Sequence, residues 1–147
     1  MDTAQRPALV LDTNIVLDLF LFADPATPPL RAALESGSHC WIATPVMRDE
    51  LERVLAYAHL LPRMAYYQVS ADSVLARFDA HVRLCEVAPK ARYICKDADD
   101  QKFIDLAVAH QARLLSKDKA VLSMARRLRS LGVETAARWA ALQTAPA

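Results

Sequence analysis

Two acidic residues follow short apolar runs that are typical of buried strands. Asp12 comes directly after the apolar residues 9–11, and Asp118 comes two residues after a second expected strand at residues 113–116. Short apolar runs with polar boundaries suit the centre of a parallel sheet, where ligands bind beyond the carboxyl ends of the strands. Taken alone, Asp12 could instead cap the following helix, and Asp118 could pair with a neighbouring lysine.

A third acidic residue, Glu50, lies near the start of the most clearly marked helix. Threonine is a good N-cap and proline fits the first helical position, so the pair Thr44-Pro45 predicts a helix over residues 45–59. At about 100° per residue, Glu50 borders the apolar face of this helix. It is the acid of this helix nearest the core, although a solvated surface acid could occupy the same position.

A fourth acidic residue, Asp100, opens a helix expected over residues 100–112. It falls near the centre of the inward face, in the first turn. A carboxylate at a helix N-terminus also gains from the helix dipole, so helix capping is an alternative role. Asp97 and Asp99 lie in the preceding loop, where they could support the site or belong to the surface, and Asp99 is the runner-up to Asp100.

Strands and helices alternate along the chain. A further strand is expected at residues 39–43, and residues 133–135 are a candidate edge strand. This alternation favours an α/β fold with parallel neighbouring strands, and the length favours a single domain over residues 1–147. Further helices are expected at residues 15–22, 30–34, 120–131 and 136–142, with two helices or one kinked helix over residues 63–84.

If the three best-marked strands are parallel neighbours, all four acids reach one edge of the sheet. Two unit charges near 4 Å repel by about 4 kcal/mol at an effective dielectric of 20, so such a group must bind a cation or take up protons. Oxygen ligands without histidine or cysteine favour a hard ion, Mg²⁺ or Mn²⁺, over zinc. These ligands therefore point to a metal-assisted reaction of phosphate groups.

The composition excludes several other classes of protein. The formal net charge of +1 gives no general basic field, so a polyanion must be held by a local patch. Two glycines in the chain are too few for a phosphate-binding P-loop or a dinucleotide fingerprint. The three widely spaced cysteines suit a reducing compartment. Charged residues interrupt the apolar N-terminal stretch, so we expect a cytoplasmic protein without a membrane segment.

The acidic residues and their neighbours come in the order of PIN-domain nucleases. The sequence resembles most closely the branch described as toxin components of toxin-antitoxin systems, over about residues 8–139. The matching stretches are Leu11-Asp12-Thr13-Asn14, the Thr44-Pro45 helix with Glu50-Leu51 and Arg53-Val54-Leu55, Asp97-Ala98-Asp99-Asp100-Gln101-Lys102-Phe103, and Leu115-Ser116-Lys117-Asp118-Lys119.

The resemblance implies a three-layer α/β/α sandwich with a mostly parallel central sheet, and cleavage of RNA that depends on Mg²⁺ or Mn²⁺. An antitoxin protein and a second copy of the chain are the protein partners that it suggests. The residues that it implies for catalysis and metal binding are Asp12, Glu50, Asp100 and Asp118, with Asn14 and Ser116 as polar supports.

In the mechanism that this resemblance suggests, Asp12 and Asp100 bind the metal directly. Glu50 and Asp118 act through water or on a second ion, and the metal activates a water that attacks the scissile phosphate. Basic residues that flank the acids could hold the RNA backbone, or could be ordinary surface charges. They are Arg48, Lys96, Lys102, Lys117 and Lys119.

Two other functions stay open. A phosphoaspartyl hydrolase or a receiver domain also places acids at strand ends, but the hydrolase pattern wants a second aspartate two residues after the first, where this chain has Asn14. A non-catalytic module that binds RNA or a protein, with a vestigial acid cluster, is the other alternative. The absence of Mg²⁺ or Mn²⁺ binding would favour it.

Overall fold

The computed structural model describes residues 6–143, and in this part of the chain five strands form one all-parallel sheet in the order β3-β2-β1-β4-β5. The prediction of one domain over residues 1–147 includes residues 1–5 and 144–147, which lie outside the described residues. The strands are β1 Ala8–Leu11, β2 Cys40–Ala43, β3 Arg83–Leu84, β4 Arg113–Leu115 and β5 Thr135–Ala136.

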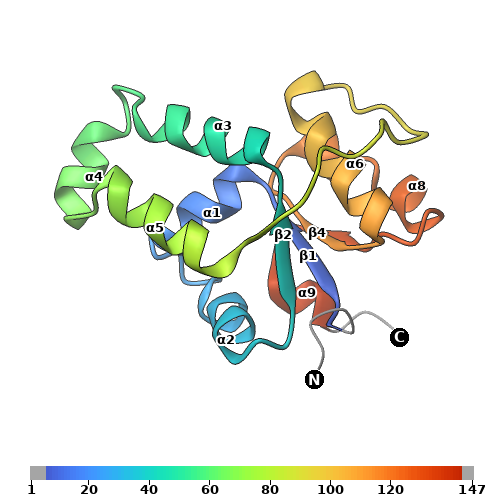
Figure 1. Ribbon diagram of the computed structural model, residues 1–147, viewed down its shortest axis with the longest axis horizontal. Helices are drawn as coiled ribbons and strands as arrows, with labels where there is room; N and C mark the ends of the chain where they lie inside the picture. Colours follow the sequence, from blue (N-terminus) through green and yellow to red (C-terminus); the bar gives the residue numbers. More distant parts are fainter. Residues whose placement is uncertain (1–5, 144–147) are drawn as a thin grey trace.

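Helices cover both faces of this sheet, so the fold is the predicted α/β type. Figure 1 shows α6 and α8 on one side of the strands and α1 and α2 on the other, while α3, α4 and α5 extend away from the sheet. The helices are α1 Thr13–Phe20, α2 Pro28–Ser36, α3 Pro45–Leu55, α4 Leu61–Tyr67, α5 Ala71–His81, the 3₁₀ helix η2 Ala98–Asp100, α6 Gln101–His110, α7 Lys119–Leu122, α8 Ala125–Arg129 and α9 Trp139–Gln143.

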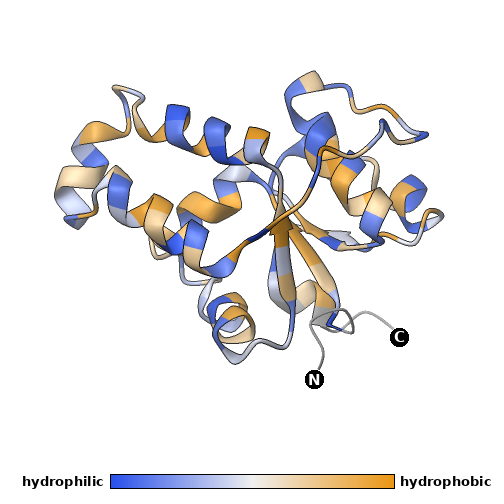
Figure 2. Cartoon of the chain, in the orientation of Figure 1, coloured by the Kyte–Doolittle hydropathy of each residue, from blue (hydrophilic) through white to orange (hydrophobic). Residues whose placement is uncertain are grey.

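The central strands are apolar on both faces because helices pack on both. Leu9, Val10 and Leu11 of β1 are buried, as is every residue of β2, and Figure 2 shows the hydrophobic colour running along these strands. This continuous burial is why the strands lack the alternation of a half-exposed sheet. None of the helices within residues 6–143 is long and apolar enough to cross a membrane.

Two helices begin where the chain leaves the sheet beside the site. The start of α3 at Pro45 is as predicted, whereas α1 begins at Thr13, two residues before the expected start at residue 15. Asp12 caps α1 by accepting a hydrogen bond from Ile15 N at 2.9 Å. Thr44 caps α3 with Pro45 in its first turn. Each cap follows a buried strand directly, so the chain turns from strand to helix at the carboxyl edge of the sheet.

Several expected elements differ from the structure. The helix expected over residues 136–142 begins at Trp139, because Ala136 belongs to β5. The helix expected over residues 45–59 ends at Leu55, where tight turns replace the helical hydrogen bonds. The helix expected over residues 120–131 is split into α7 and α8, since the Ser123 hydroxyl bonds to the carbonyl of Ala120 and competes with the helical ladder. The two-residue strand β3 lies within the expected helical segment 63–84, and it is exposed and paired only with β2.

The burial of α6 on the sheet gives a test of the core. Ile104 lies on α6, which packs on β1 and β4, and its side chain is fully buried, whereas Ile94 in the preceding loop is 55% exposed. We expect Ile104→Ala to lower the free energy of unfolding by about 2–5 kcal/mol, because it leaves a cavity. Ile94→Ala should cost less than about 1 kcal/mol. Urea unfolding followed by circular dichroism measures both, and equal losses would contradict this packing.

Candidate active site

The pairing of β1 with β4 brings Asp12 and Asp118 to one edge of the sheet. Leu11 lies opposite Leu115 in the register of the two strands, and Asp12 N donates to Leu115 O at 3.0 Å. Asp12 and Ser116 therefore follow the ends of neighbouring parallel strands, and Asp118 lies two residues further. The expectation that the best-marked strands are parallel neighbours is confirmed.

Asp12 is buried, and Ser116 fixes its carboxylate. Asp12 Oδ2 accepts from Ser116 Oγ at 2.5 Å, and Oδ1 accepts from Ile15 N, so this residue is a helix cap and a site residue at once. Ser116 Oγ in turn accepts from Asp118 N at 3.1 Å. Burial raises the pKa of the Asp12 carboxyl, while the bonds from Ser116 and Ile15 act to lower it.

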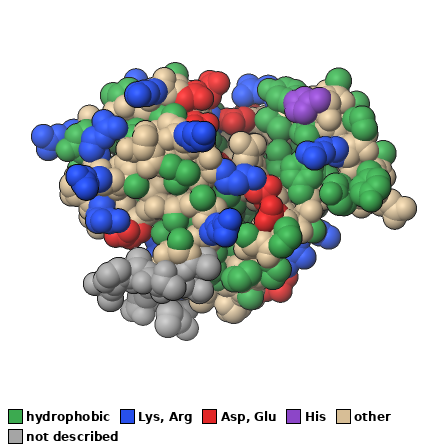
Figure 3. Space-filling model, turned by 180° about the vertical axis from the view of Figure 1, so that it is seen from behind, with side chains coloured by type: hydrophobic (Ala, Val, Ile, Leu, Met, Phe, Trp, Pro, Cys, Tyr) green, Lys and Arg blue, Asp and Glu red, His purple; other side chains and the backbone are tan. Residues whose placement is uncertain are grey.

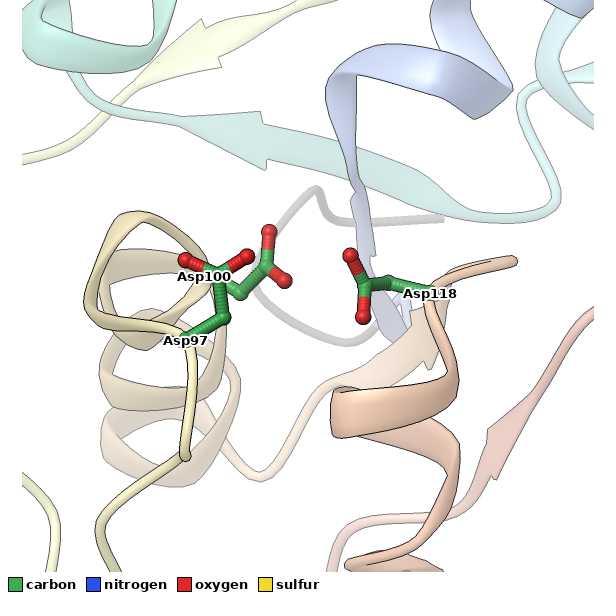
Figure 4. Close-up of side chains that lie close together, drawn as sticks. All are labelled: Asp97, Asp100 and Asp118. Atoms are coloured by element: carbon green, nitrogen blue, oxygen red, sulfur yellow. The ribbon is translucent and has the colours of Figure 1, made fainter.

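Three further carboxylates face one another beside Asp12. Figure 4 shows Asp97, the N-cap of η2, and Asp100, the last residue of η2, on the side that faces Asp118 at the start of α7. One carboxylate oxygen from each of the three lies within 4.8 Å of the others. With Asp12, these residues form what we call the acid group: Asp12, Asp97, Asp100 and Asp118.

The surroundings of Asp100 disfavour its ionised form. Its Oδ2 is buried and, as a carboxylate oxygen, accepts no hydrogen bond from any described residue. Burial is the largest cause that raises the pKa of Asp100 to about 7, followed by a hydrogen bond that its protonated form shares with Asp118 and by repulsion from Asp118, Asp97 and Asp12. A neutral Asp100 can donate to Asp118, whereas an ionised Asp100 needs a cation.

The ligand atoms that the acid group offers fit a hard divalent ion. They are carboxylate oxygens, which suit Mg²⁺ or Mn²⁺ better than the nitrogen and sulfur ligands that zinc prefers. The buried oxygen of Asp100 without a donor is an independent sign that the group is incomplete without a proton or a cation.

Glu50, predicted as a member of the set, lies in a separate ion pair between α3 and α6. Its Oε2 pairs with Lys102 Nζ, and its Oε1 accepts from Thr13 Oγ1 at 3.0 Å. Thr13 follows Asp12 and Lys102 follows Asp100 by two positions, so this pair borders the acid group. Sequence reasoning identified Glu50 and Lys102, but it did not identify Thr13 as a contact.

The other predicted supports differ in their surroundings. Ser116 has the expected role, since it holds Asp12. Asn14 and Asp99 are exposed, and it is Thr13 rather than Asn14 that touches an acid. Asp97, which the sequence left as a loop residue, lies in the acid group. The one local signal for Asp97 is its position as the N-cap of η2, where its Oδ1 accepts from Asp99 N at 3.0 Å.

The irregular segment that carries Asp97 is fastened to α6 by two side chains. Gln101 accepts from Cys95 N at 2.6 Å and donates to Tyr93 O at 3.2 Å. Asp105, one turn later, accepts from Ala91 N at 2.8 Å and from the Gln101 amide at 2.8 Å. These contacts fix the position of the segment that leads into η2. They also give Asp105 a structural role, outside the acid group.

The basic residues predicted to hold RNA have unlike surroundings. Arg48 forms two bonds with Asp79 of α5, at 2.7 and 2.9 Å, which turn its guanidinium toward that helix. Lys117 pairs with the buried Asp18 at 2.5 Å, and both residues line a pocket of about 350 Å³. Lys96 and Lys119 are exposed. Figure 3 shows acidic side chains in a notch of the molecule with lysine and arginine side chains on its rim.

Comparison with known protein families identifies the family of this chain. A profile described as the PIN domain matches residues 8–120, which is well over half of the chain and contains every member of the acid group. The chain belongs to the PIN-domain family. PIN domains are generally nucleases, so the family supports an enzyme of the nuclease kind. Comparison with curated proteins finds no match.

The raised pKa of Asp100 in this PIN domain predicts an unusual dependence of stability on pH. The pKa is about 7 in the folded chain against an ordinary value of 3.8, so the folded state binds more protons between these limits. Stability from this group is therefore lost as the pH rises from about 4 to about 7. We expect Asp100→Asn to raise the melting temperature at pH 8 and to change it much less at pH 5.

Thermal melting at the two pH values measures this effect. Asp99→Asn is the matched control, because Asp99 is the exposed neighbour, and it should leave the pH dependence of the wild type intact. An Asp100→Asn variant that follows the wild-type curve at both pH values would show that Asp100 is ionised without strain.

Proposed function

We propose that this PIN domain is an endoribonuclease that hydrolyses phosphodiester bonds of RNA with Mg²⁺ or Mn²⁺. The observation that carries the proposal is the convergence of the acid group at the carboxyl edge of the sheet, with a buried Asp100 oxygen that no donor satisfies. The family match makes phosphodiester cleavage the reaction that fits such a group. No nucleophilic side chain is required for this chemistry.

Asp12, Asp97, Asp100 and Asp118 are the residues that would hold the ion. A divalent ion there supplies positive charge that acidifies water and offsets charge developing on the phosphodiester. The part of the chain is to fix the carboxylates: Ser116 holds Asp12, and the amides of Asp99 and Ala120 hold Asp97 and Asp118. Asp100 gives up its proton most easily when a cation is near, since cations lower the pKa of adjacent carboxyls.

RNA is the proposed substrate because the resemblance to toxin-like PIN domains implies it. The basic residues near the acids, Lys102 above all, would contact phosphates, so binding should weaken as salt rises. Sequence preference would come from the shape of single-stranded regions and from stacking of their bases. The toxin role, an antitoxin partner, a homodimer and a cytoplasmic location stay predictions. A small adjacent reading frame that encodes a DNA-binding antitoxin would support the toxin role.

Other chemistries fit the described residues less well. A phosphoaspartyl hydrolase needs a second acid near the position of Asn14, and that residue is exposed at the start of α1. A non-catalytic binding module would not need a carboxylate with a pKa near neutrality. Calorimetric titration with Mn²⁺ distinguishes the nuclease from this module, because only the nuclease needs to bind the metal ion.

Removal of single carboxylates tests the proposed site directly. We expect Asp12→Asn and Asp118→Asn each to lower cleavage of a labelled RNA in Mg²⁺ or Mn²⁺ by on the order of 100-fold or more, since a lost ligand costs at least as much as a lost supporting group. Asp49→Asn, an exposed acid on α3, is the control and should retain activity. Full activity in both site variants, with the fold intact by circular dichroism, would refute the proposal.

A further inference from the structure

A partly buried ion pair between Glu50 and Lys102 lies next to the acid group. Glu50 is on α3 and Lys102 is in the first turn of α6, and their side chains are 20% and 23% exposed. Besides Glu50, the Lys102 ammonium donates to the carbonyl of Asp99 and lies 4.9 Å from the centre of the Phe103 ring. The pair joins two helices that reach the carboxyl edge of the sheet from different parts of the chain.

The contacts of Glu50 are those of a carboxylate that already has its partners. One oxygen accepts from Thr13 and the other pairs with Lys102, so both lie against donors. Asp100 is the opposite case, because its buried oxygen has no donor within the described part of the chain. Of these two acids, Asp100 needs a proton or a cation, and Glu50 already has a cation.

The position of Lys102 is unfavourable without Glu50. A cation in the first turn of a helix opposes the helix dipole, which favours negative charge there. A lysine also loses side-chain freedom when it is fixed, and exposed lysines such as Lys96 and Lys119 avoid that cost. A residue that breaks local rules and is held by specific partners is typical of a functional position.

The charge balance of the site suggests what a fixed lysine does. The acid group contains four carboxylates, and one divalent ion leaves it with excess negative charge when all are ionised. An RNA phosphate that approaches this edge is therefore repelled unless another cation is in place. Lysine binds phosphate as a compact point charge, and Lys102 is a cation that the fold holds beside the acids, as Lys117 is near Asp12.

We infer that Glu50 is a positioning residue for Lys102 rather than a metal ligand, and that the Lys102 ammonium binds an RNA phosphate beside the acid group. The inference rests on the proposed nuclease function and assigns the work of two of its residues. It makes the metal site depend on the four aspartates, and it makes the pair a separate contact to the substrate backbone.

Calorimetric titration with Mn²⁺ alone tests the role of Glu50. Asp100→Asn should weaken Mn²⁺ binding by about tenfold or more, whereas Glu50→Gln and Lys102→Met should change it by less than about threefold. Glu52→Gln is the matched control, because Glu52 lies on the same helix and is 63% exposed. A loss in Glu50→Gln as large as that in Asp100→Asn would make Glu50 a ligand and overturn the inference.

Binding of a fluorescent oligouridylate in EDTA, where no metal-dependent cleavage occurs, tests the role of Lys102. Across a salt series, Lys102→Met should reduce the slope of log affinity against log salt by about 0.7, the value for one phosphate contact on a single strand. Lys102→Arg should keep the slope, and so should Lys90→Met, which removes an exposed lysine elsewhere. An unchanged slope in Lys102→Met would overturn the inference.

A double-mutant cycle on kcat/KM for RNA cleavage tests the link between the two residues. If Glu50 acts through Lys102, the Glu50→Gln/Lys102→Met double variant should be no slower than Lys102→Met alone. Fully multiplicative losses would mean that the residues act independently. A wild type that neither binds Mn²⁺ nor cleaves RNA would instead refute the proposed function, so the two failures are distinct.

Discussion

Repulsion among carboxylates at the ends of β1 and β4 is the constraint on which the rest of the site depends. Parallel pairing forces the residues after Leu11 and Leu115 to lie side by side, and both segments carry an aspartate. The fold compensates this repulsion with donors: Ser116 and the N-terminal amides of α1, η2 and α7 each bond to a carboxylate. What remains uncompensated is concentrated at Asp100.

The three central strands and their parallel pairing were predictable, because strands buried on both faces are apolar throughout. Residues 9–11 and 40–43 are apolar throughout, since helices cover both faces of the sheet. Once three such runs alternate with helices, parallel pairing follows, and the convergence of Asp12, Asp100 and Asp118 follows from the pairing. The alternative role of Asp12 as a helix cap is also correct, because one carboxylate oxygen serves each purpose.

What sequence could not reveal are contacts made by side chains from distant elements. The neighbours of Glu50 come from α1 and α6, so helical geometry could show that Glu50 borders the core but not that Lys102 and Thr13 occupy its oxygens. Asp97 lies in a segment without periodicity, where no face can be assigned. The strand β3 has two exposed residues and exists only through its pairing with β2.

The attachment of segment 85–97 to α6 has a consequence for how firmly the site is built. Gln101 and Asp105 lie one turn apart on α6, and Ile104 of the same helix is fully buried. The loop is therefore attached to a helix that is part of the core. Irregular backbone held in this way shares the order of the helix beneath it and opens only when the helix does. Asp97 is then part of the same cooperative unit as the sheet, although its segment has no regular structure of its own.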